Sequence, residues 1–367
     1  MIISTDDYAT IKEDKVLGRY VVNEQITAFL NERVTNFPME TVGHSVKNRP
    51  IMAITMGEGK KKILMWSQMH GNESTTTKAI LDLINLLNSK SNFAKEILKN
   101  CTIKIIPILN PDGAHAYTRV NANQVDLNRD AQNRSQPESK ILRNVYDNFE
   151  PNYCFNLHDQ RTIYNVATSS KPATVSFLAP AHDSERSISK TRLIAMRLIV
   201  GMNEMLQEMI PGQVGRYDDA FNANCVGDTF QMLNTPTILF EAGHFQEDYE
   251  REKTREYVLH SMVKALDTMA SDTIKEYNHN SYFEIPENGK YFFDILVKNA
   301  PIPNSLDRKD VGILYTEVLE GEKISFIPKI VQEGKLDNFF GHETYDCMNS
   351  SAVSYLRNSN LSQLLKI

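Results

Sequence analysis

Short apolar runs alternate with longer amphipathic stretches along most of this chain, and that alternation limits the folds that it can adopt. The runs are rich in β-branched residues, as strands are, and several are apolar at nearly every position, as strands covered on both faces are. The predicted strands are "IMAITMG" (51–57), "KILMWSQ" (62–68), "TIKIIPIL" (102–109), "YCFNLH" (153–158), "VSFLAP" (175–180) and "TPTILFE" (235–241).

The stretches between these strands repeat their apolar residues at helical spacing. In residues 75–87 one face of the predicted helix carries Ala79, Ile80, Leu83, Ile84 and Leu87. Residues 187–209 and 255–274 show the same pattern at greater length. Strands that alternate with helices predict an α/β fold with a mixed, mostly parallel central sheet covered by helices. We assign this fold to residues 1–280.

The pattern changes after residue 280, where no long helical stretch separates the apolar runs. The predicted strands of this region are "YFFDILV" (291–297), "VGILYTEVL" (311–319) and "KISFIPKIV" (323–331). Polar segments that contain proline and glycine lie between them. We therefore expect residues 281–367 to form a smaller, β-rich C-terminal portion.

Charge and composition exclude several classes of partner. The 367-residue chain has a formal net charge of −6, which disfavours nucleic acids and anionic membrane surfaces as partners. No apolar run reaches the roughly 18 residues of a transmembrane helix. The first residues, "MIISTDDYATIKEDK", lack the basic start and apolar stretch of a signal peptide, so we expect a cytoplasmic protein. The four cysteines form no C-x-x-C pair, which favours reduced thiols. Nothing in the sequence specifies an oligomeric state.

The segment "QMHGNEST" (68–75) holds the first candidate functional residues, His70 and Glu73. Both lie between a predicted strand and a predicted helix, and the glycine and asparagine between them allow a sharp turn. Their side chains would project from the carboxyl edge of the sheet, where open α/β folds place their sites. The pair suits a metal site. A polar turn, in which Glu73 favours the helix N-terminus, explains it as well.

His158 and Glu241 also stand at the carboxyl ends of predicted strands. Taken alone, His158 is an ordinary histidine at a strand end, and Glu241 is a capping or ion-paired acid. An acid directly after apolar residues is nevertheless costly to bury unless it is paired or functional. Asp159 or a backbone carbonyl is the expected hydrogen-bond partner of His158. Four candidates at strand ends together indicate a functional site.

These segments, in this order, resemble the zinc carboxypeptidase family, the carboxypeptidase A-like metallopeptidases. "GHSVKNRPI" (43–51) resembles the entry segment of the family, "HGNES" (70–74) its first two ligands, and "NPDGAHAYTRVNANQVDLNRD" (110–130) its N-P-D-G and N-R signatures. "PES" (137–139), "NLHD" (156–159) and "TILFEAG" (237–243) follow. The resemblance covers roughly residues 40–250 and implies the central sheet of a zinc carboxypeptidase.

The resemblance implies a catalytic centre with one Zn²⁺ per chain. His70, Glu73 and His158 would hold the ion and leave a position for water. Glu241 would act as general base and then as general acid. Arg119 would face the oxyanion that develops in the transition state. From the residues alone, Arg119 could equally be part of a surface ion pair.

The resemblance also implies residues that bind substrate. Asn128 and Arg129 would hold a substrate carboxylate, for which the planar guanidinium fork is suited. Taken alone, Arg129 could be in a surface ion pair and "NPDG" could be only a turn. Tyr217 is the candidate for a lid tyrosine. Asp228 either lines the pocket for the terminal side chain or caps a helix, and we expect the cap.

Three functions remain to be weighed. The leading hypothesis is a zinc-dependent metallocarboxypeptidase that hydrolyses the C-terminal bond of a peptide or peptide-like substrate with a free carboxylate. The second is a zinc amidase of the same fold that acts on cell-wall peptides or N-acyl amino acids. The third is a binding module without catalysis, which predicts a missing ligand or base, and none is missing.

Overall fold

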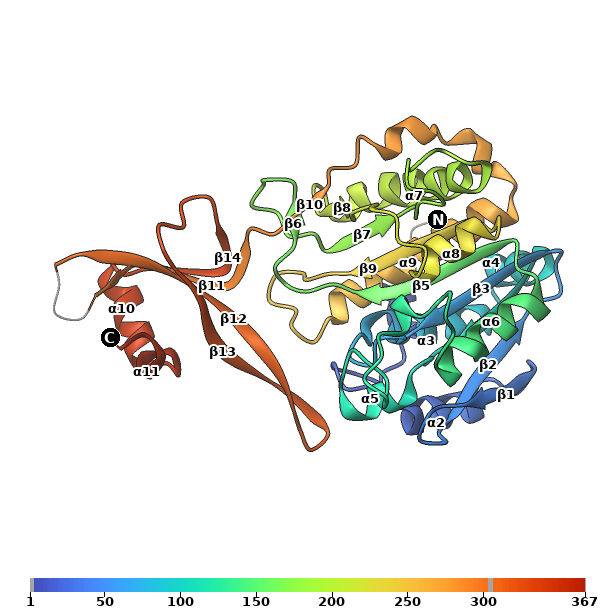
Figure 1. Cartoon of the computed structure of the whole chain (residues 1–367), viewed down its shortest axis with the longest axis horizontal. Coiled ribbons are helices and arrows are strands. Elements are labelled where there is room, and N and C mark those ends of the chain that lie inside the picture. Colours follow the sequence, from blue (N-terminus) through green and yellow to red (C-terminus); the bar gives the residue numbers. More distant parts are fainter. Residues whose placement is uncertain (1–2, 303–305, 367) are drawn as a thin grey trace.

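The computed structural model describes residues 3–302 and 306–366, which form a large α/β body and a smaller C-terminal sheet (Figure 1). The body is built on an eight-stranded sheet in the order β1-β2-β4-β3-β5-β9-β7-β8. Its strands are β1 (Met39–His44), β2 (Pro50–Met56), β3 (Lys61–Ser67), β4 (Cys101–Ile106), β5 (Tyr153–Asp159), β7 (Val175–Leu178), β8 (Val214–Arg216) and β9 (Thr237–Ala242). The central strands β4, β3, β5 and β9 run parallel to one another.

Helices connect and cover these strands. They are α1 (Thr5–Ile11), α2 (Asn23–Arg33), α3 (Thr75–Leu87), α4 (Asn92–Asn100), α5 (Pro111–Ala116), α6 (Pro137–Phe149), α7 (Lys190–Met209), α8 (Val226–Met232) and α9 (Glu252–Ala270), with single 3₁₀ turns at Leu127–Arg129, Thr273–Glu276 and His279–Tyr282. A small ladder joins β6 (Asn165–Val166) to β10 (Asn288–Gly289). In the described part of the chain, no helix combines the length and the apolar character needed to cross a membrane.

The central sheet is buried on both faces. Residues of α3, α7 and α9 form one hydrophobic cluster with the sheet, and residues of α6 and α8 form another on its opposite side. In β3, Ile63 and Met65 belong to the first cluster, whereas Leu64 and Trp66 belong to the second. Because successive side chains of a strand point to opposite faces, a strand between two helical layers must be apolar throughout.

The expected α/β fold with a mixed central sheet is confirmed. The six strands predicted before residue 280 correspond to β2, β3, β4, β5, β7 and β9, and the helix predicted at 75–87 is α3 with the same bounds. The helices α7 and α9 occupy the other two predicted stretches. The helix α7 ends at the predicted residue, whereas its start and both ends of α9 are displaced by a few residues. The edge strand β1 contains only exposed and half-buried residues, so no apolar run marks it.

A four-stranded sheet follows the body in the order β13-β12-β11-β14. Its strands are β11 (Phe292–Pro301), β12 (Arg308–Glu320), β13 (Lys323–Gly334) and β14 (Phe340–Asp346). This confirms the β-rich C-terminal portion. Two short helices, α10 (Ser350–Asn358) and α11 (Leu361–Leu365), end the chain and were not predicted, since α10 fully buries only Leu356. We call residues 292–366 the appendage.

A buried ion pair ties the N-terminal segment to the body. Arg255 on α9 donates to both carboxylate oxygens of Asp82 on α3, at 2.6 and 2.7 Å. Arg255 also donates to the backbone carbonyls of Glu13 (2.8 Å) and Val16 (3.0 Å). The hydroxyl of Tyr8 donates to Asp82 at 3.1 Å. Both charged side chains are fully buried, so the loss of one would leave the other without compensation.

We expect Asp82→Asn to lower the free energy of unfolding by about 3 to 5 kcal/mol, as the removal of one partner from a buried ion pair does. Urea unfolding followed by circular dichroism measures the change. The matched control is Glu32→Gln, which removes the acid of the exposed pair between Lys15 and Glu32 and should leave stability nearly unchanged. An equally small effect for both variants would contradict the anchoring role of Asp82.

Candidate metal centre and active-site cleft

The loop after β3 turns at Gln68. This residue adopts a φ of 48°, in the left-handed region. Its side chain donates to the carbonyls of Val21 and Gly71, both at 2.8 Å, and accepts from the hydroxyl of Thr77 at 2.9 Å. The sharp turn that was expected from the glycine and asparagine is therefore provided largely by a buried, hydrogen-bonded glutamine.

Gly71 serves close packing and does not have a positive φ. A Cβ atom on Gly71 would lie 1.9 Å from the carbonyl carbon of Gly113, so the two backbones touch. Gly113 belongs to "NPDG", where the side-chain oxygen of Asn110 accepts its N–H at 2.9 Å. The Asn110 amide donates in turn to the carbonyl of Met69 at 3.1 Å. The "NPDG" segment is thus more than a turn, because it forms the surface on which the "HGNES" loop packs.

Asp159, at the end of β5, positions the start of α3. Its carboxylate accepts the backbone N–H groups of Thr75 (2.9 Å) and Thr76 (3.3 Å), and its own N–H donates to Oε2 of Glu73 at 3.2 Å. The prediction that Asp159 or a backbone carbonyl partners His158 is wrong, since Nε2 of His158 is buried without a hydrogen-bond partner among the described residues. The helix N-terminus competes successfully for this carboxylate because it presents unpaired N–H groups.

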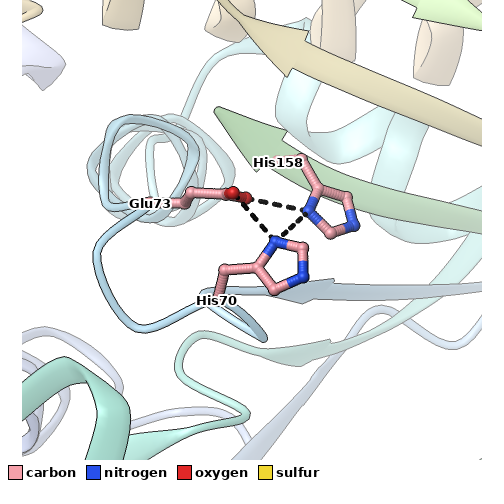
Figure 2. A group of neighbouring side chains, drawn as sticks. All are labelled: His70, Glu73 and His158. Atoms are coloured by element: carbon pink, nitrogen blue, oxygen red, sulfur yellow. Dashed lines mark hydrogen bonds and ion pairs between the residues drawn. The ribbon is translucent and has the colours of Figure 1, made fainter. Parts of the chain in front are cut away.

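His70 and Glu73, in the loop between β3 and α3, and His158, in strand β5, point toward one another (Figure 2). The Nδ1 atoms of the two imidazoles are 3.1 Å apart. One oxygen of Glu73 lies 2.8 Å from Nδ1 of His70, and the other lies 2.8 Å from Nδ1 of His158. All three side chains are buried, and their ligand atoms lie within 4.8 Å of one another.

This donor set fits a zinc ion. Imidazole nitrogens and one carboxylate are ligands that zinc prefers. Without a metal, two Nδ1 atoms this close can form at most one hydrogen bond with each other. A bound cation would instead accept the lone pairs of both nitrogens. Burial would lower the pKa of His70, but the charge of Glu73 together with the hydrogen bonds to Asp126 and Glu73 raises that pKa. Burial lowers the pKa of His158. His70, Glu73 and His158 are therefore the residues that would hold the metal.

Asp126 completes this centre, and sequence reasoning missed it. Its Oδ1 lies 3.0 Å from Nε2 of His70, which directs the Nδ1 of that ring toward the centre. It also accepts from Nε of Arg119 at 3.1 Å and from the N–H of Asn128 at 2.9 Å. Burial opposes its ionisation, but His70 and Arg119 hold the pKa of Asp126 well below its ordinary value. The sequence signal that could have identified Asp126 is its position directly before "LNR" (127–129).

Glu241 and Arg119 flank the three converging side chains. The parallel register of β5 and β9 places Glu241 opposite His158. Glu241 is buried, and its Oε2 has no hydrogen-bond partner in the described part of the chain. Burial, helped by the charges of Glu73 and Asp159, raises the pKa of Glu241 well above its ordinary value. Nη1 of Arg119 lies 3.3 Å from Oε1 of Glu73. A carboxylate with an unused oxygen and a guanidinium thus face the centre.

One cleft of about 530 Å³ brings together all of the site residues expected from the sequence. Two of these residues, Asn128 and Arg129, lie in the 3₁₀ turn at Leu127–Arg129. Oδ1 of Asn128 accepts the N–H of Val226 at 3.1 Å, which fixes its side-chain amide. Arg129 is exposed and donates to the carbonyl of Asn128 at 2.8 Å. Its remaining guanidinium donors suit a carboxylate ligand.

Tyr217 and Asp228 form another part of the cleft wall. The hydroxyls of Tyr217 and Tyr164 are 2.9 Å apart. Asp228 lies in the first turn of α8, but the N-cap of that helix is Cys225, so the expectation that Asp228 acts as the cap is wrong. Burial raises the pKa of Asp228 to about 7. The wall therefore presents a carboxyl group that is easily neutralised.

A family model described as zinc carboxypeptidase matches residues 24–291. Among curated relatives, Carboxypeptidase E of Caenorhabditis elegans is 34% identical over 149 residues, which cover 33% of this chain and 32% of the relative. A probable carboxypeptidase 2 of Trichophyton verrucosum is 27% identical over 101 residues, which cover 27% of this chain and 20% of the relative. The chain therefore aligns with only a fifth to a third of the length of these relatives.

Solved structures share the fold at low identity. A metallo-carboxypeptidase from Burkholderia cenocepacia has a TM-score of 0.55 and 20% identity, over 68% of this chain and 69% of that chain. A carboxypeptidase A from Helicoverpa armigera has a TM-score of 0.55 and 15% identity, over 70% and 75%. The fold agrees with the family model, which spans the whole central sheet and the site described above. This chain belongs to the zinc carboxypeptidase family.

Proposed function

We propose that this chain is a zinc-dependent metallocarboxypeptidase that hydrolyses the C-terminal bond of a peptide or peptide-like substrate with a free carboxylate. The observation that carries the proposal is the convergence of His70, Glu73 and His158 beside the unpaired carboxylate oxygen of Glu241. A binding module without catalysis would need none of this arrangement. The relatives are named carboxypeptidases, which favours a peptidase over an amidase.

The metal would be held by His70, Glu73 and His158. A zinc ion in such a site lowers the pKa of a bound water toward neutrality and polarises a carbonyl oxygen. Asp126 keeps His70 in the tautomer that presents Nδ1 to the centre. Asp159 holds the start of α3, and with it the Glu73 carboxylate, in place.

Glu241 would move the proton. Its Oε2 has no hydrogen-bond partner among the described residues, which leaves it available to accept a proton from a water molecule. As water attacks the carbonyl carbon, Glu241 accepts a proton from the water. It then delivers that proton to the amine nitrogen as the C–N bond breaks, which leaves a new carboxylate and a free amine.

Arg119, Asn128 and Arg129 would orient the substrate. The guanidinium of Arg119 is held near the centre by Glu73 and Asp126, so it is already positioned for negative charge on the carbonyl oxygen. Asn128 and Arg129, at the edge of the same cleft, would bind the terminal carboxylate. Tyr217 would cover the bound residue from the opposite wall.

We expect the purified protein to bind about one zinc ion per chain. His158→Ala should lose that zinc because it removes one of the protein ligands. Metal analysis by mass spectrometry after dialysis measures the stoichiometry. His115→Ala, at an exposed histidine outside the cleft, is the control and should retain the metal. Unchanged zinc content in His158→Ala would remove His158 from the ligand set.

We expect Glu241→Gln to retain zinc and to lose kcat by about 10²- to 10⁴-fold, the usual contribution of a positioned general acid–base. Steady-state hydrolysis of N-acylated dipeptides measures the rate, and metal analysis checks the zinc. Glu204→Gln, at an exposed glutamate on α7, should behave like the wild type. Turnover near the wild-type rate in Glu241→Gln would rule out the proton-transfer role.

We expect Arg129→Gln to lower kcat/KM by about 10- to 100-fold for substrates with a free C-terminal carboxylate, since a hydrogen bond to a charged group contributes about 1.5 to 3 kcal/mol. The matched control substrates are C-terminally amidated peptides. The wild type should cleave them poorly, and Arg129→Gln should cleave them no more slowly than the wild type does. An equal loss for acid and amide substrates would contradict a carboxylate anchor at Arg129.

A further inference from the structure

A second cavity, of about 330 Å³, lies between the body and the appendage. We call it the hairpin chamber, because the β12–β13 hairpin supplies much of one wall. From the appendage it is lined by Asp294, Leu314, Tyr315, Glu317 and Phe326. The opposite wall comes from the body, chiefly from Arg19, Asn72, Tyr249, Arg251 and the segment after β5. Neither part of the chain encloses this space alone.

Specific contacts hold the hairpin against the body. In Figure 1 the hairpin extends beside the body toward α5. There Glu317 accepts from the hydroxyl of Tyr117, at the end of α5, and pairs with Arg19 at 3.0 Å. Deeper in, the hydroxyl of Tyr249 donates to Asp294 at 3.0 Å, and the ring of Tyr249 packs edge-on against Tyr315 at 5.2 Å. The chamber is therefore a fixed feature of the fold.

The hairpin chamber adjoins the active-site cleft beside the candidate metal ligand Glu73. Glu73, Arg119 and Arg161 line both spaces, as do Asp159 and Gln160. Asn128, Arg129 and Tyr217 line only the cleft. A substrate with its terminal carboxylate at Arg129 and its reacting carbonyl near Arg119 would therefore direct its acyl side into the chamber.

The carboxylates of the chamber already have hydrogen-bond donors. Asp159 accepts from the N-terminus of α3. Asp294 accepts from the hydroxyl of Tyr249 and from the N–H of Tyr315, the latter at 2.7 Å. Glu317 accepts from Arg19 and Tyr117. These acids therefore contribute few unused acceptors to a ligand.

The guanidinium groups of the chamber, in contrast, have unused donors. Nε of Arg19 and Nε of Arg251 are both buried without a partner in the described part of the chain. Arg251 is 1% exposed and donates only to the backbone carbonyls of Ala242 and Gln160, at 2.9 and 3.0 Å. Arg161, at the junction with the cleft, forms no hydrogen bond or ion pair with any described residue. Arg161 is exposed and therefore offers free guanidinium donors at the chamber entrance, whereas Arg251 contributes a buried positive charge that pairs with no carboxylate of the described residues.

We propose that the hairpin chamber binds a carboxylate carried by the acyl side of the substrate, so that the enzyme prefers an acidic residue before the bond that it cleaves. Guanidinium donors bind carboxylates through strong, charge-assisted hydrogen bonds that are frequently bidentate. Arg161 meets the group at the entrance, and the buried positive charge of Arg251, behind the chamber wall, attracts it. This inference rests on the proposed carboxypeptidase function and adds the substrate class.

The test compares four substrates that share one C-terminal residue. They are N-acetyl-α-glutamyl, N-acetyl-γ-glutamyl, N-acetyl-glutaminyl and N-acetyl-lysyl derivatives of alanine, and the series is repeated with phenylalanine and lysine as the C-terminal residue. We expect kcat/KM for at least one glutamyl substrate to exceed that of the glutaminyl analogue by about tenfold or more. The α- and γ-linked substrates show whether the bound carboxylate comes from the side chain or from the main chain.

Arg161→Gln should bring that preference close to unity, because it lowers kcat/KM for the glutamyl substrate more than for the glutaminyl substrate. Arg357→Gln, at an exposed arginine of α10 that lines neither space, is the matched control and should keep the preference. Equal rates for glutamyl and glutaminyl substrates in the wild type would overturn the inference. A preference that survives in Arg161→Gln would overturn the role of Arg161.

A binding measurement separates failure of this inference from failure of the proposed function. Zinc-loaded protein is titrated with N-acetylglutamate and with N-acetylglutamine, the acyl products of the reaction, by calorimetry. If no substrate is cleaved, the proposed function fails. Tighter binding of N-acetylglutamate that disappears in Arg161→Gln would still support the chamber as a carboxylate site. Equal binding of the two acyl products would contradict it.

Discussion

The site depends on three parallel strands, β3, β5 and β9, whose carboxyl ends meet at one edge of the central sheet. His70 follows the first strand, His158 lies at the end of the second, and Glu241 stands opposite His158 on the third. Glu73 reaches the same point because Asp159 holds the first N–H groups of α3. Burying polar side chains this closely costs free energy, which a metal ion bound between His70, Glu73 and His158 would offset.

Much of the fold and of the site could be predicted from the sequence. Strands with helices on both faces must be apolar throughout, so β3, β5 and β9 were visible as apolar runs. The amphipathic face of α3 defined its bounds. His70, His158 and Glu241 were visible because a polar residue directly after such a run is unusual.

Other features could not be predicted because their causes are tertiary. Gly71 is required by the nearby backbone of Gly113, which is distant in sequence. Asp126 orients His70 only after the intervening loop has folded. Asp159 binds the N-terminus of α3 and not His158, a choice that depends on how the helix is placed. The helix α10 buries too little apolar surface to leave a clear pattern.

The appendage gives the site a second boundary that the central sheet alone does not provide. Glu317 of its hairpin pairs with Arg19, Asp294 of β11 accepts from Tyr249, and the appendage thereby encloses a space beside Glu73 and Arg119. The family model ends at residue 291, before the first strand of the appendage. The catalytic groups thus lie in the part shared with the family, whereas the residues of the chamber wall come partly from outside it. With the proposed roles, this division would let a catalytic centre shared with the family serve a particular class of substrate.

The central claim is that His70, Glu73 and His158 bind one zinc ion. A crystal structure with anomalous diffraction measured at the zinc edge tests it most directly. The account predicts one zinc peak at about 2.0 to 2.2 Å from Nδ1 of His70, Nδ1 of His158 and a carboxylate oxygen of Glu73. A zinc peak bound by other side chains, or a zinc-saturated crystal with no peak among these three residues, would contradict it.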